Sequence, residues 1–332
     1  MSVSIIIPTL NEENYIADCL ESLLASLTDC KEYEIIIVDG ESNDNTINIV
    51  NQFRKNNQRI KIINNPKKIA PSALNLGVEA SKYDIIIRCD AHAYYPSEYI
   101  QNNIDLLISS DEKTMNVGGY IYSKSKDKNL ISSSIAKVLS SSFGVGNSNF
   151  RTGATKNKKI IEADTVPFGC FKKSIFKLIG NFNEDEPANE DIEFNHRIRK
   201  HGYKILLSNS ITSYYYVRSN LIDFIKQTLR NGLITTINKN FSFRSIRHYT
   251  PLFFFLFLIF GLISILIFNN KIILFLYYLG ISMYLIFILV GTVFILIKHK
   301  ELKFLFIGPF LFFVLHFFYG LGSFIGLITK KV

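Results

Sequence analysis

Two ionisable side chains stand at the end of an apolar run in the segment IIIRCDAHAYYP, residues 85–96. Three isoleucines give way abruptly to Arg88, Asp90 and His92. A carboxylate and an imidazole two residues apart can bind a ligand or exchange protons. The same pattern is also typical of a strand end that is exposed to solvent. The rest of the chain has to decide between these two interpretations.

A second pair of candidate residues lies in the segment ANEDIEF. Glu190 and Asp191 fall in the first turn of a predicted helix, behind Asn189 as a candidate N-cap. The helix dipole favours an ionised carboxylate at this position, and a general base must be ionised to accept a proton. Dipole complementation alone also places acids in the first turns of helices without any catalytic role. From these residues alone, both interpretations stay open.

Short apolar runs bounded by turn residues predict β-strands that are covered on both faces. The predicted strands are residues 2–8, 34–40, 59–65 and 84–90. Helical spacing of apolar residues predicts helices between them, over about 16–27 with Asn11 as N-cap, 47–53 and 72–80. This alternation predicts a doubly wound, mostly parallel α/β sheet.

Polar residues follow three of the four predicted strands, where a sheet of this class binds its ligands. They are residues 9–12, Asp39, and the group of Arg88, Asp90 and His92. No G-x-G-x-x-G follows the first strand, and the chain has no G-x-x-x-x-G-K-[ST]. Ordinary dinucleotide binding and P-loop phosphoryl transfer are therefore disfavoured. The convergence of polar strand ends is the first indication of a site.

The composition changes at Pro251, after which three long runs carry no formal charge. Each run is long enough to cross a bilayer, so they predict transmembrane spans at about 251–268, 272–297 and 304–329. Most flanking basic residues precede the first span or follow the second: Lys239, Arg244, Arg247, Lys298, Lys300 and Lys303. Only Lys271 lies in the first hairpin. The positive-inside rule thus places residues 1–250 in the cytoplasm, although three spans leave Lys330 and Lys331 on the opposite side.

The net charge of +9 does not indicate a nucleic-acid-binding protein, because the basic residues form no RNA-binding signature and gather partly near the apolar runs. Attraction to anionic lipid and to phosphate-bearing substrates explains the charge better. The four cysteines show no C-x-x-C or zinc-ligand spacing. They are expected to be reduced core residues.

Four segments, in order, resemble the family 2 glycosyltransferases with a GT-A fold. They are SIIIPTLNEENYIADCLESLL, EIIIVDGESNDNT, IIIRCDAHAYYP and NEDIEFNHRIRKHGYKI, and together they cover roughly residues 2–205. The D-A-H segment, DTVPFG (164–169) and the three apolar runs look most like the succinoglycan-type membrane enzymes of bacterial exopolysaccharide synthesis. The resemblance implies a cytosolic, Rossmann-like GT-A domain followed by about three transmembrane helices. The expected domains are 1–215 (catalytic), 216–248 (an amphipathic interfacial segment) and 249–332 (membrane).

The resemblance also implies a metal site. The family has Asp-x-Asp at the end of the fourth strand, and this chain has Asp90-Ala91-His92. A divalent cation, Mn²⁺ or Mg²⁺, is expected at Asp90 and His92, where it neutralises the charge on the leaving nucleotide. Imidazole suits Mn²⁺ better than Mg²⁺, so the histidine leaves the identity of the metal open.

Further roles follow from the resemblance alone. It implies that Asp191 is the catalytic base and that Glu190 is its neighbour. The residues implied to line the nucleotide-sugar site are Pro8, Thr9, Asn11, Glu12, Asp39, Asn75, Arg88 and Asp90. Asp39 would accept a hydrogen bond from a uracil base, although an Asx turn in DGESNDNT equally favours Asp there. Weaker matches suggest acceptor or diphosphate contacts at Asp164, Gln227 and Arg230. The last two lack the tryptophan of the family's Gln-x-x-Arg-Trp, because the chain contains none.

The resemblance thus predicts an inverting, metal-dependent transferase in the inner membrane, with the catalytic domain facing the cytoplasm. Its partners would be a nucleoside-diphosphate sugar, with UDP favoured, a lipid-linked acceptor and the membrane, but no nucleic acid. The acceptor is either a polyprenyl diphosphate glycan, extended by single additions, or bare polyprenyl phosphate, giving a sugar-phosphate lipid. An inactive, membrane-anchored nucleotide-sugar-binding scaffold is the remaining alternative.

Overall fold

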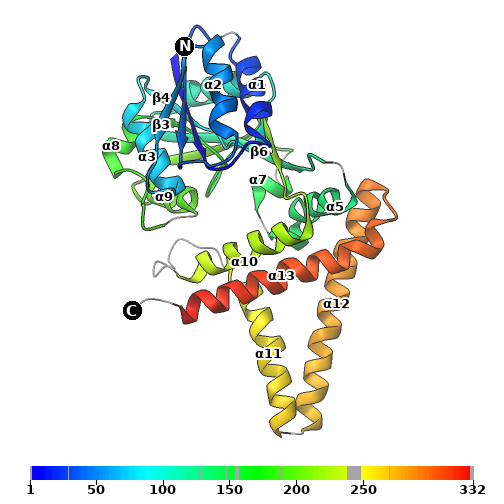
Figure 1. Cartoon of the computed structure of the whole chain (residues 1–332). Helices are drawn as coiled ribbons and strands as arrows, with labels where there is room; N and C mark the ends of the chain where they lie inside the picture. The colour runs from blue at the N-terminus through cyan, green and yellow to red at the C-terminus, as the bar shows by residue number, and fades with distance from the viewer. Residues whose placement is uncertain are drawn as a thin grey trace. The chain divides into compact units, whose positions relative to one another are not determined.

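The computed structural model describes residues 2–28, 30–127, 129–146, 148–153, 157–186, 189–237, 248–268 and 270–329. Its contacts divide the chain into two compact units (Figure 1). The sheet unit consists of Met1–Tyr122 and Gly153–Tyr216, and the helical unit of Ser123–Thr152 and Val217–Val332. The sequence predicts a continuous domain over 1–215, whereas the structure groups Ser123–Thr152 with the helical unit. Part of the predicted interfacial segment, 238–247, lies outside the described residues.

The first half of the sheet unit is parallel, as the apolar runs predict. Its strands lie in the order β3-β2-β1-β4 and are β1 (Ser2–Thr9), β2 (Glu32–Asp39), β3 (Ile60–Asn64) and β4 (Ile85–Arg88). The register aligns Thr9 with Asp39 and Asp39 with Asn64, so three strands end at the same level. Polar residues that follow these strands therefore share one edge of the sheet, which we call the carboxyl edge.

Helices follow the parallel strands and cover the isoleucine core. They are α1 (Ile16–Ser26), α2 (Thr46–Asn56) and α3 (Ala70–Ala80). Gly77 lets α3 approach β1 closely, because a Cβ there would lie 2.4 Å from the side chain of Ile6. The predicted N-cap at Asn11 is wrong, since α1 begins at Ile16 with Tyr15 at the N-cap. Asn11 instead lies in the turn after β1 with a φ of 55°.

The second half of the sheet unit adds antiparallel strands and further helices. The strands continue the order as β4-β8-β6-β9-β5, with β7 paired to β9. The strands are β5 (Ala93–Tyr94), β6 (Thr114–Lys124), β7 (Ile160–Glu162), β8 (Cys170–Lys172) and β9 (Lys204–Tyr216). The helices are α4 (Tyr99–Ser109), α8 (Ser174–Ile179) and α9 (Glu190–Lys200). This gives a mixed, mostly parallel core with a meander at one side, the Rossmann-like arrangement of a GT-A fold. The four cysteines are free and buried.

Within the described part of the helical unit, three helices are long and apolar enough to cross a membrane. They are α11 (Thr250–Phe268), α12 (Lys271–His299) and α13 (Phe304–Ile328), close to the bounds predicted from the sequence. The remaining helices are α5 (Leu130–Leu139), α6 (Ser142–Val145), α7 (Asn149–Thr152) and α10 (Leu221–Ile237). The basic residues Lys239, Arg244, Arg247, Lys330 and Lys331 lie outside the described residues.

Candidate active site

The turns after β1 and β2 are joined by hydrogen bonds at the carboxyl edge. The backbone N–H of Asn11 donates to Ser42 Oγ at 2.9 Å, and its side-chain oxygen accepts from the Asn43 N–H at 3.0 Å. The N–H of Glu12 donates to Thr46 Oγ1 at 2.8 Å. These contacts hold Asn11 in its left-handed conformation, which few non-glycine residues adopt. The two turns therefore form one rigid wall beside the strand ends.

Asp39 lies inside this wall and is buried. Its Oδ2 accepts from the Ser42 N–H at 2.9 Å, and its Oδ1 accepts from Ser42 Oγ at 2.6 Å. The carboxylate thus closes a local turn, which is the alternative that the DGESNDNT sequence allows. A contact between Asp39 and a uracil base stays a prediction. Pro8 and Thr9 end the neighbouring strand, with Thr9 buried.

Arg88, at the end of β4, lies between acidic residues that are distant in the sequence. Its Nε and Nη2 each donate to Asp90 Oδ1 at 3.3 Å. Its Nη1 lies 2.8 Å from Glu190 Oε1, as a close ion pair without hydrogen-bond geometry. Burial lowers the pKa of Arg88, but Asp90, Glu190 and Asp191 more than offset this and raise it. Arg88 is therefore a fixed cation at the carboxyl edge, and Nη1 makes no hydrogen bond within the described residues.

Tyr95 fixes the backbone of Asp90, a role that sequence reasoning missed. The Asp90 N–H donates to the Tyr95 hydroxyl at 2.7 Å, and that hydroxyl lies 3.3 Å from the Asp90 carbonyl oxygen. Tyr95 itself is only 1% exposed, and its N–H donates to Ser22 Oγ at 3.2 Å. Only the position of this tyrosine, shortly after the strand end, could have suggested the contact. The buried side chain of Tyr95 thus fixes the backbone at the polar end of β4.

His92 pairs with Glu12, so the segments that follow β4 and β1 meet. Nδ1 of His92 lies 2.9 Å from Glu12 Oε1, and the ring packs edge-on against Tyr215 with centroids 4.9 Å apart. Burial favours the neutral imidazole, but Tyr215, the hydrogen bond to Glu12 and the charge of Asp90 together raise the pKa of His92 to about 10. The pair is therefore a second contact between opposite charges at this edge.

The two acidic residues in the first turn of α9 differ in burial and in the groups that they contact. Glu190 is buried, and burial raises its pKa, with Asp191 adding to the rise and Arg88 opposing it. Asp191 is half-buried, and its Oδ1 accepts from the Ile192 N–H at 2.8 Å. Asn189 occupies the N-cap position with a φ of 65°, but its side chain makes no capping hydrogen bond. Glu190 is committed to Arg88, whereas Asp191 is accessible to a ligand.

A buried chain of polar side chains holds α9 against the sheet. Asn116 on β6 donates to Asn195 Oδ1 at 2.7 Å, and Asn195 donates to Thr165 Oγ1 at 2.8 Å. All three residues are at most 4% exposed. Hydrogen bonds made inside the protein are costly to break, because the remaining group is left without a partner. This chain ties the segment 164–169 to the helix that carries Asp191.

The other predicted residues have contacts or positions of their own. The side-chain amide of Asn75 binds the segment before α9. It donates to Phe182 O at 3.0 Å and accepts from the Phe182 N–H at 2.9 Å. Asp164 is exposed and accepts from the adjacent Thr165 N–H. Gln227 and Arg230 belong to α10 of the helical unit. The roles of these four residues toward a ligand stay predictions.

The donors at the carboxyl edge are suited to a metal that takes most of its ligands from a substrate. Among the described residues, no group of three or more His, Cys, Asp and Glu side chains is placed to hold a metal ion. Mg²⁺ and similar ions need only one or two carboxylates when a diphosphate and water complete their coordination. Asp90 meets this requirement, because its side chain is 21% exposed. His92 can contribute only Nε2 while Nδ1 contacts Glu12.

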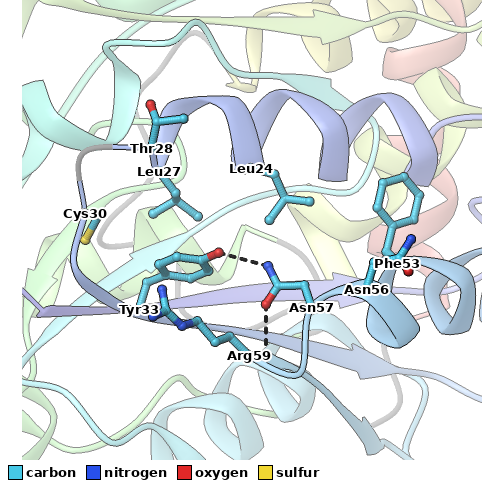
Figure 2. A pocket seen from close by; sticks show the side chains of 9 residues that line it. All are labelled: Leu24, Leu27, Thr28, Cys30, Tyr33, Phe53, Asn56, Asn57 and Arg59. Carbon is cyan, nitrogen blue, oxygen red and sulfur yellow. Dashed lines mark hydrogen bonds between the residues drawn. The ribbon is translucent and has the colours of Figure 1, made fainter.

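A cavity of about 520 Å³ in the sheet unit lies elsewhere (Figure 2). It is lined by the end of α1, the end of α2 and the residues that begin β2 and β3. Figure 2 shows Tyr33, Asn57 and Arg59 on one side of it and Leu24 and Leu27 on the other. These residues lie at the amino edge of the parallel strands, opposite the carboxyl edge. The cavity therefore contains none of the candidate catalytic residues.

The fold agrees with that of a known family. The family model described as "Glycosyl transferase family 2" matches residues 4–179, and the chain belongs to this family. It is accordingly a nucleotide-sugar glycosyltransferase with a GT-A fold.

Two relatives and one solved structure place the chain more closely. It is 33% identical, over 98% of its length and 97% of the relative, to the dolichyl N-acetyl-alpha-D-glucosaminyl phosphate 3-beta-D-2,3-diacetamido-2,3-dideoxy-beta-D-glucuronosyltransferase of Methanococcus voltae. It is 29% identical to the succinoglycan biosynthesis protein ExoA of Rhizobium meliloti (strain 1021), over 69% of this chain and 67% of that protein. The fold resembles the mannosyltransferase PcManGT from Pyrobaculum calidifontis, solved with GDP-Man and Mn²⁺. The TM-score is 0.66 at 13% identity, over 99% of this chain and 88% of that one.

Proposed function

We propose that this glycosyltransferase moves a sugar, with inversion, from a nucleoside-diphosphate sugar to a lipid-linked acceptor. The observation that supports this most is the meeting of Arg88, Asp90 and Glu190 at the carboxyl edge of the sheet. These three ionisable groups come together from distant segments at the strand ends, where a sheet of this class binds its ligands. The Methanococcus relative is named for a dolichyl phosphate-linked sugar, which favours an acceptor that already carries a saccharide.

Asp191 is the proposed base. It takes the proton of the acceptor hydroxyl while that oxygen attacks the anomeric carbon, and the bond from this carbon to the diphosphate breaks on the opposite side. Glu190 is excluded from this role by its burial and its ion pair with Arg88. The asparagine and threonine chain behind α9 keeps Asp191 in position. In the first turn of α9, Asp191 thus acts as the base and Glu190 holds the guanidinium of Arg88.

Asp90 is proposed to hold a divalent cation bound to the diphosphate, and His92 joins it through Nε2 in the neutral form of its imidazole. A metal of this kind stabilises the charge that develops on the leaving nucleotide. Arg88 supplies further positive charge to the same group. The wall formed by residues 9–13 and 39–46 borders the position expected for the nucleoside, beyond the ends of β1 and β2.

The apolar helices fit a lipid-linked acceptor, because they anchor the enzyme in the membrane that contains it. The excess of Lys and Arg before the first and after the second apolar helix favours a cytoplasmic catalytic domain. We therefore propose a multi-pass enzyme of cell-surface glycan synthesis in the cytoplasmic membrane. The domains proposed on this basis are 1–215 (catalytic), 216–248 (interfacial) and 249–332 (membrane). Within the first, Ser123–Thr152 is grouped with the helical unit.

The test is transfer by the purified full-length chain from a panel of nucleotide sugars, with Mn²⁺, Mg²⁺ or EDTA. Acceptors would be polyprenyl phosphate and a polyprenyl phosphate-linked saccharide. The expected product is the saccharide lipid extended by one sugar, formed only with metal and lost in Asp90→Ala. Transfer to bare polyprenyl phosphate alone would identify the sugar-phosphate lipid synthase instead. Binding of nucleotide sugars without transfer to either acceptor would contradict the proposal and indicate a scaffold.

A further inference from the structure

The last apolar helix, α13, packs against α10 with almost no side chains between the two backbones. A Cβ on Gly322 would lie 2.0 Å from Leu229 O, and one on Gly326 would lie 2.4 Å from Leu233 O. Both helices advance by four residues between these contacts and in the same direction. Figure 1 shows α10 and α13 lying side by side. They therefore run parallel and in contact over more than one turn.

Hydrogen bonds connect the two helices along the same stretch. Ser323 Oγ donates to Gly232 O at 3.1 Å, and Thr236 Oγ1 donates to Ser323 O at 2.5 Å. The hydroxyls of Thr235 and Tyr319 lie 2.7 Å apart. Small residues that allow close backbone contact and hydrogen bonds between helices are the features that hold apolar helices together. The pair is one rigid element, so α10 and α13 must lie at the same depth in a bilayer.

The depth of the pair is limited by α10, which carries charged and amide side chains on its outer face. Asp223, Lys226, Gln227, Arg230 and Asn231 all belong to this helix, and Lys226, Arg230 and Asn231 are exposed. Arg230 directly follows Leu229, which contacts Gly322 near the C-terminal end of α13. Charged side chains are costly within the hydrocarbon core and are favoured at the headgroup level. α10 is therefore suited to the membrane surface, and α13 is tied to it.

The exposed residues of α13 fit such a position. Its buried positions include Gly308, Leu311, Leu315, Gly322 and Gly326, which recur at helical spacing on one side. Its strongly exposed positions are all apolar and are Leu305, Phe306, Phe310, Phe313, Leu327 and Ile328. The open positions lie in 305–313 and 327–328, whereas no residue of 314–326 is exposed and Gly320 packs on Pro251 and Phe255 of α11. A helix that is held by protein along its middle and keeps apolar side chains open toward both ends is suited to lie in the plane of the interface.

The hairpin of α11 and α12 is less buried than α13. Phe255 contacts both Phe317 and Phe324, so α11 crosses α13 near its own beginning rather than running along it. In α11 the buried residues are Leu252 and Phe255, and none lies in 256–268. In α12 none lies in 271–287. The distal half of the hairpin thus extends past α13 with apolar side chains on all sides, and Figure 1 shows it pointing away from α10 and α13.

We propose that only α11 and α12 cross the bilayer and that α13 lies with α10 in the interface on the side where α11 begins. The 19 residues of α11 give a helix of about 28 Å, close to the 30 Å of the hydrocarbon core. The partner of the exposed face of α13 is the acyl and headgroup boundary of a lipid monolayer.

Two spans also remove the exception in the charge distribution. The chain returns to its starting side after α12, so Lys298, Lys300 and Lys303 share that side with the C-terminal residues Lys330 and Lys331. Lys271 is then the one basic residue of the sequence in the loop on the far side. The positive-inside rule is satisfied by two spans and violated at the C-terminus by three.

The depth of α13 can be measured by tryptophan fluorescence, because the chain contains no natural tryptophan. Phe306→Trp, Phe313→Trp and Ile328→Trp would be reconstituted as full-length chains in vesicles of lipids brominated at different acyl positions. The proposal expects the same shallow quenching profile for all three variants. A deep profile for Phe313→Trp between two shallow ones would overturn it. Phe275→Trp, Met283→Trp and Phe294→Trp in α12 are the matched controls, with Met283→Trp expected to be the deepest.

A second measurement gives the side of the membrane on which α13 ends. Thr329→Cys, Leu302→Cys and Asn270→Cys would be labelled in sealed vesicles with an impermeant maleimide, and the four native cysteines give little background because they are buried. Thr329→Cys should label together with Leu302→Cys and opposite to Asn270→Cys. Labelling of Thr329→Cys together with Asn270→Cys would show three spans. Neither measurement uses sugar transfer, so the proposed function stands or falls separately.

Discussion

The two edges of the parallel sheet use charge in opposite ways. At the amino edge, Glu34 on β2 is buried and accepts hydrogen bonds from Ser4 Oγ at 2.6 Å, Lys61 Nζ at 2.7 Å and the Lys82 N–H. At the carboxyl edge, Arg88 is held between two acids and keeps a buried N–H group without a hydrogen bond. Glu34 is a buried anion with donors fixed around it, whereas Arg88 is a cation that ion-pairs with carboxylates from two distant segments.

The backbone conformation also distinguishes the carboxyl edge from the amino edge. Residues with positive φ follow the carboxyl ends of β1 and β2, at Asn11 (55°) and Glu41 (60°), and another precedes α9, at Asn189 (65°). Such conformations cost free energy in non-glycine residues and persist where surrounding contacts enforce them. The comparison teaches that the sheet concentrates backbone strain and ion pairs between distant segments at one edge. Substitutions there should affect turnover, and substitutions at the amino edge should affect stability.

The largest effect is expected for Asp191→Asn. An amide cannot accept the acceptor proton, so kcat should fall by about 10²- to 10⁴-fold, the usual contribution of a general base. The unfolding temperature should stay unchanged, because Asp191 is half-buried and bonds only its neighbour within the described residues. Steady-state kinetics and thermal unfolding of the same preparation check this.

The matched control is Asp185→Asn, which removes an exposed carboxylate from the segment before α9. It should keep the wild-type kcat. Equal losses in the two variants would show that the Asp191 effect reflects local charge rather than proton transfer.

At the amino edge, Glu34→Gln should lower the free energy of unfolding by about 1.5–3 kcal/mol, the range for a hydrogen bond to a charged group. Burial raises the pKa of Glu34, but the bonds from Lys61, Ser4 and Lys82 outweigh it and lower the pKa. A lowered folded pKa stabilises the protein above the unfolded pKa of about 4.3, and this stabilisation is lost as the pH falls through the folded pKa. The stability difference between wild type and variant should therefore shrink below about pH 4.

Thermal unfolding between pH 7 and pH 3 measures this difference, and transfer at pH 7 is the accompanying readout. The variant should retain wild-type kcat and KM. A loss of activity larger than the loss of folded protein would contradict the separation between the two edges.

The smallest effect is expected for Tyr95→Phe, which removes the hydroxyl that holds the Asp90 backbone. One neutral hydrogen bond contributes about 0.5–1.5 kcal/mol, so kcat/KM should fall by roughly 2- to 10-fold. Tyr94→Phe, at a neighbouring side chain that is 40% exposed, should have no effect. An unchanged kcat/KM in Tyr95→Phe would show that the position of Asp90 does not depend on this contact.

Much of the fold and part of the site could be predicted locally. The isoleucine runs predicted four parallel strands, and the expected amphipathic segment 216–248 contains α10 (Leu221–Ile237). The polar strand ends converge because parallel strands place their carboxyl ends at one edge. Asn11 failed as a predicted N-cap because a sequence pattern cannot show that Ser42 and Asn43 bind it in a turn. Nor could the sequence show that Glu190 pairs with Arg88 and Glu12 with His92.

The sequence by itself determined the family, the succession of the parallel strands along the chain and the presence of three long apolar helices, because these depend on residue types and periodicities within short windows. Only the tertiary structure decided which charges pair across the carboxyl edge and that Ser123–Thr152 belongs with the helical unit. It alone also decided that α13 packs along α10. Those features depend on which surfaces meet, and contacts between distant segments leave no periodic signal in either segment alone. The same apolar composition can therefore belong to a helix that crosses a membrane or to one that lies on it.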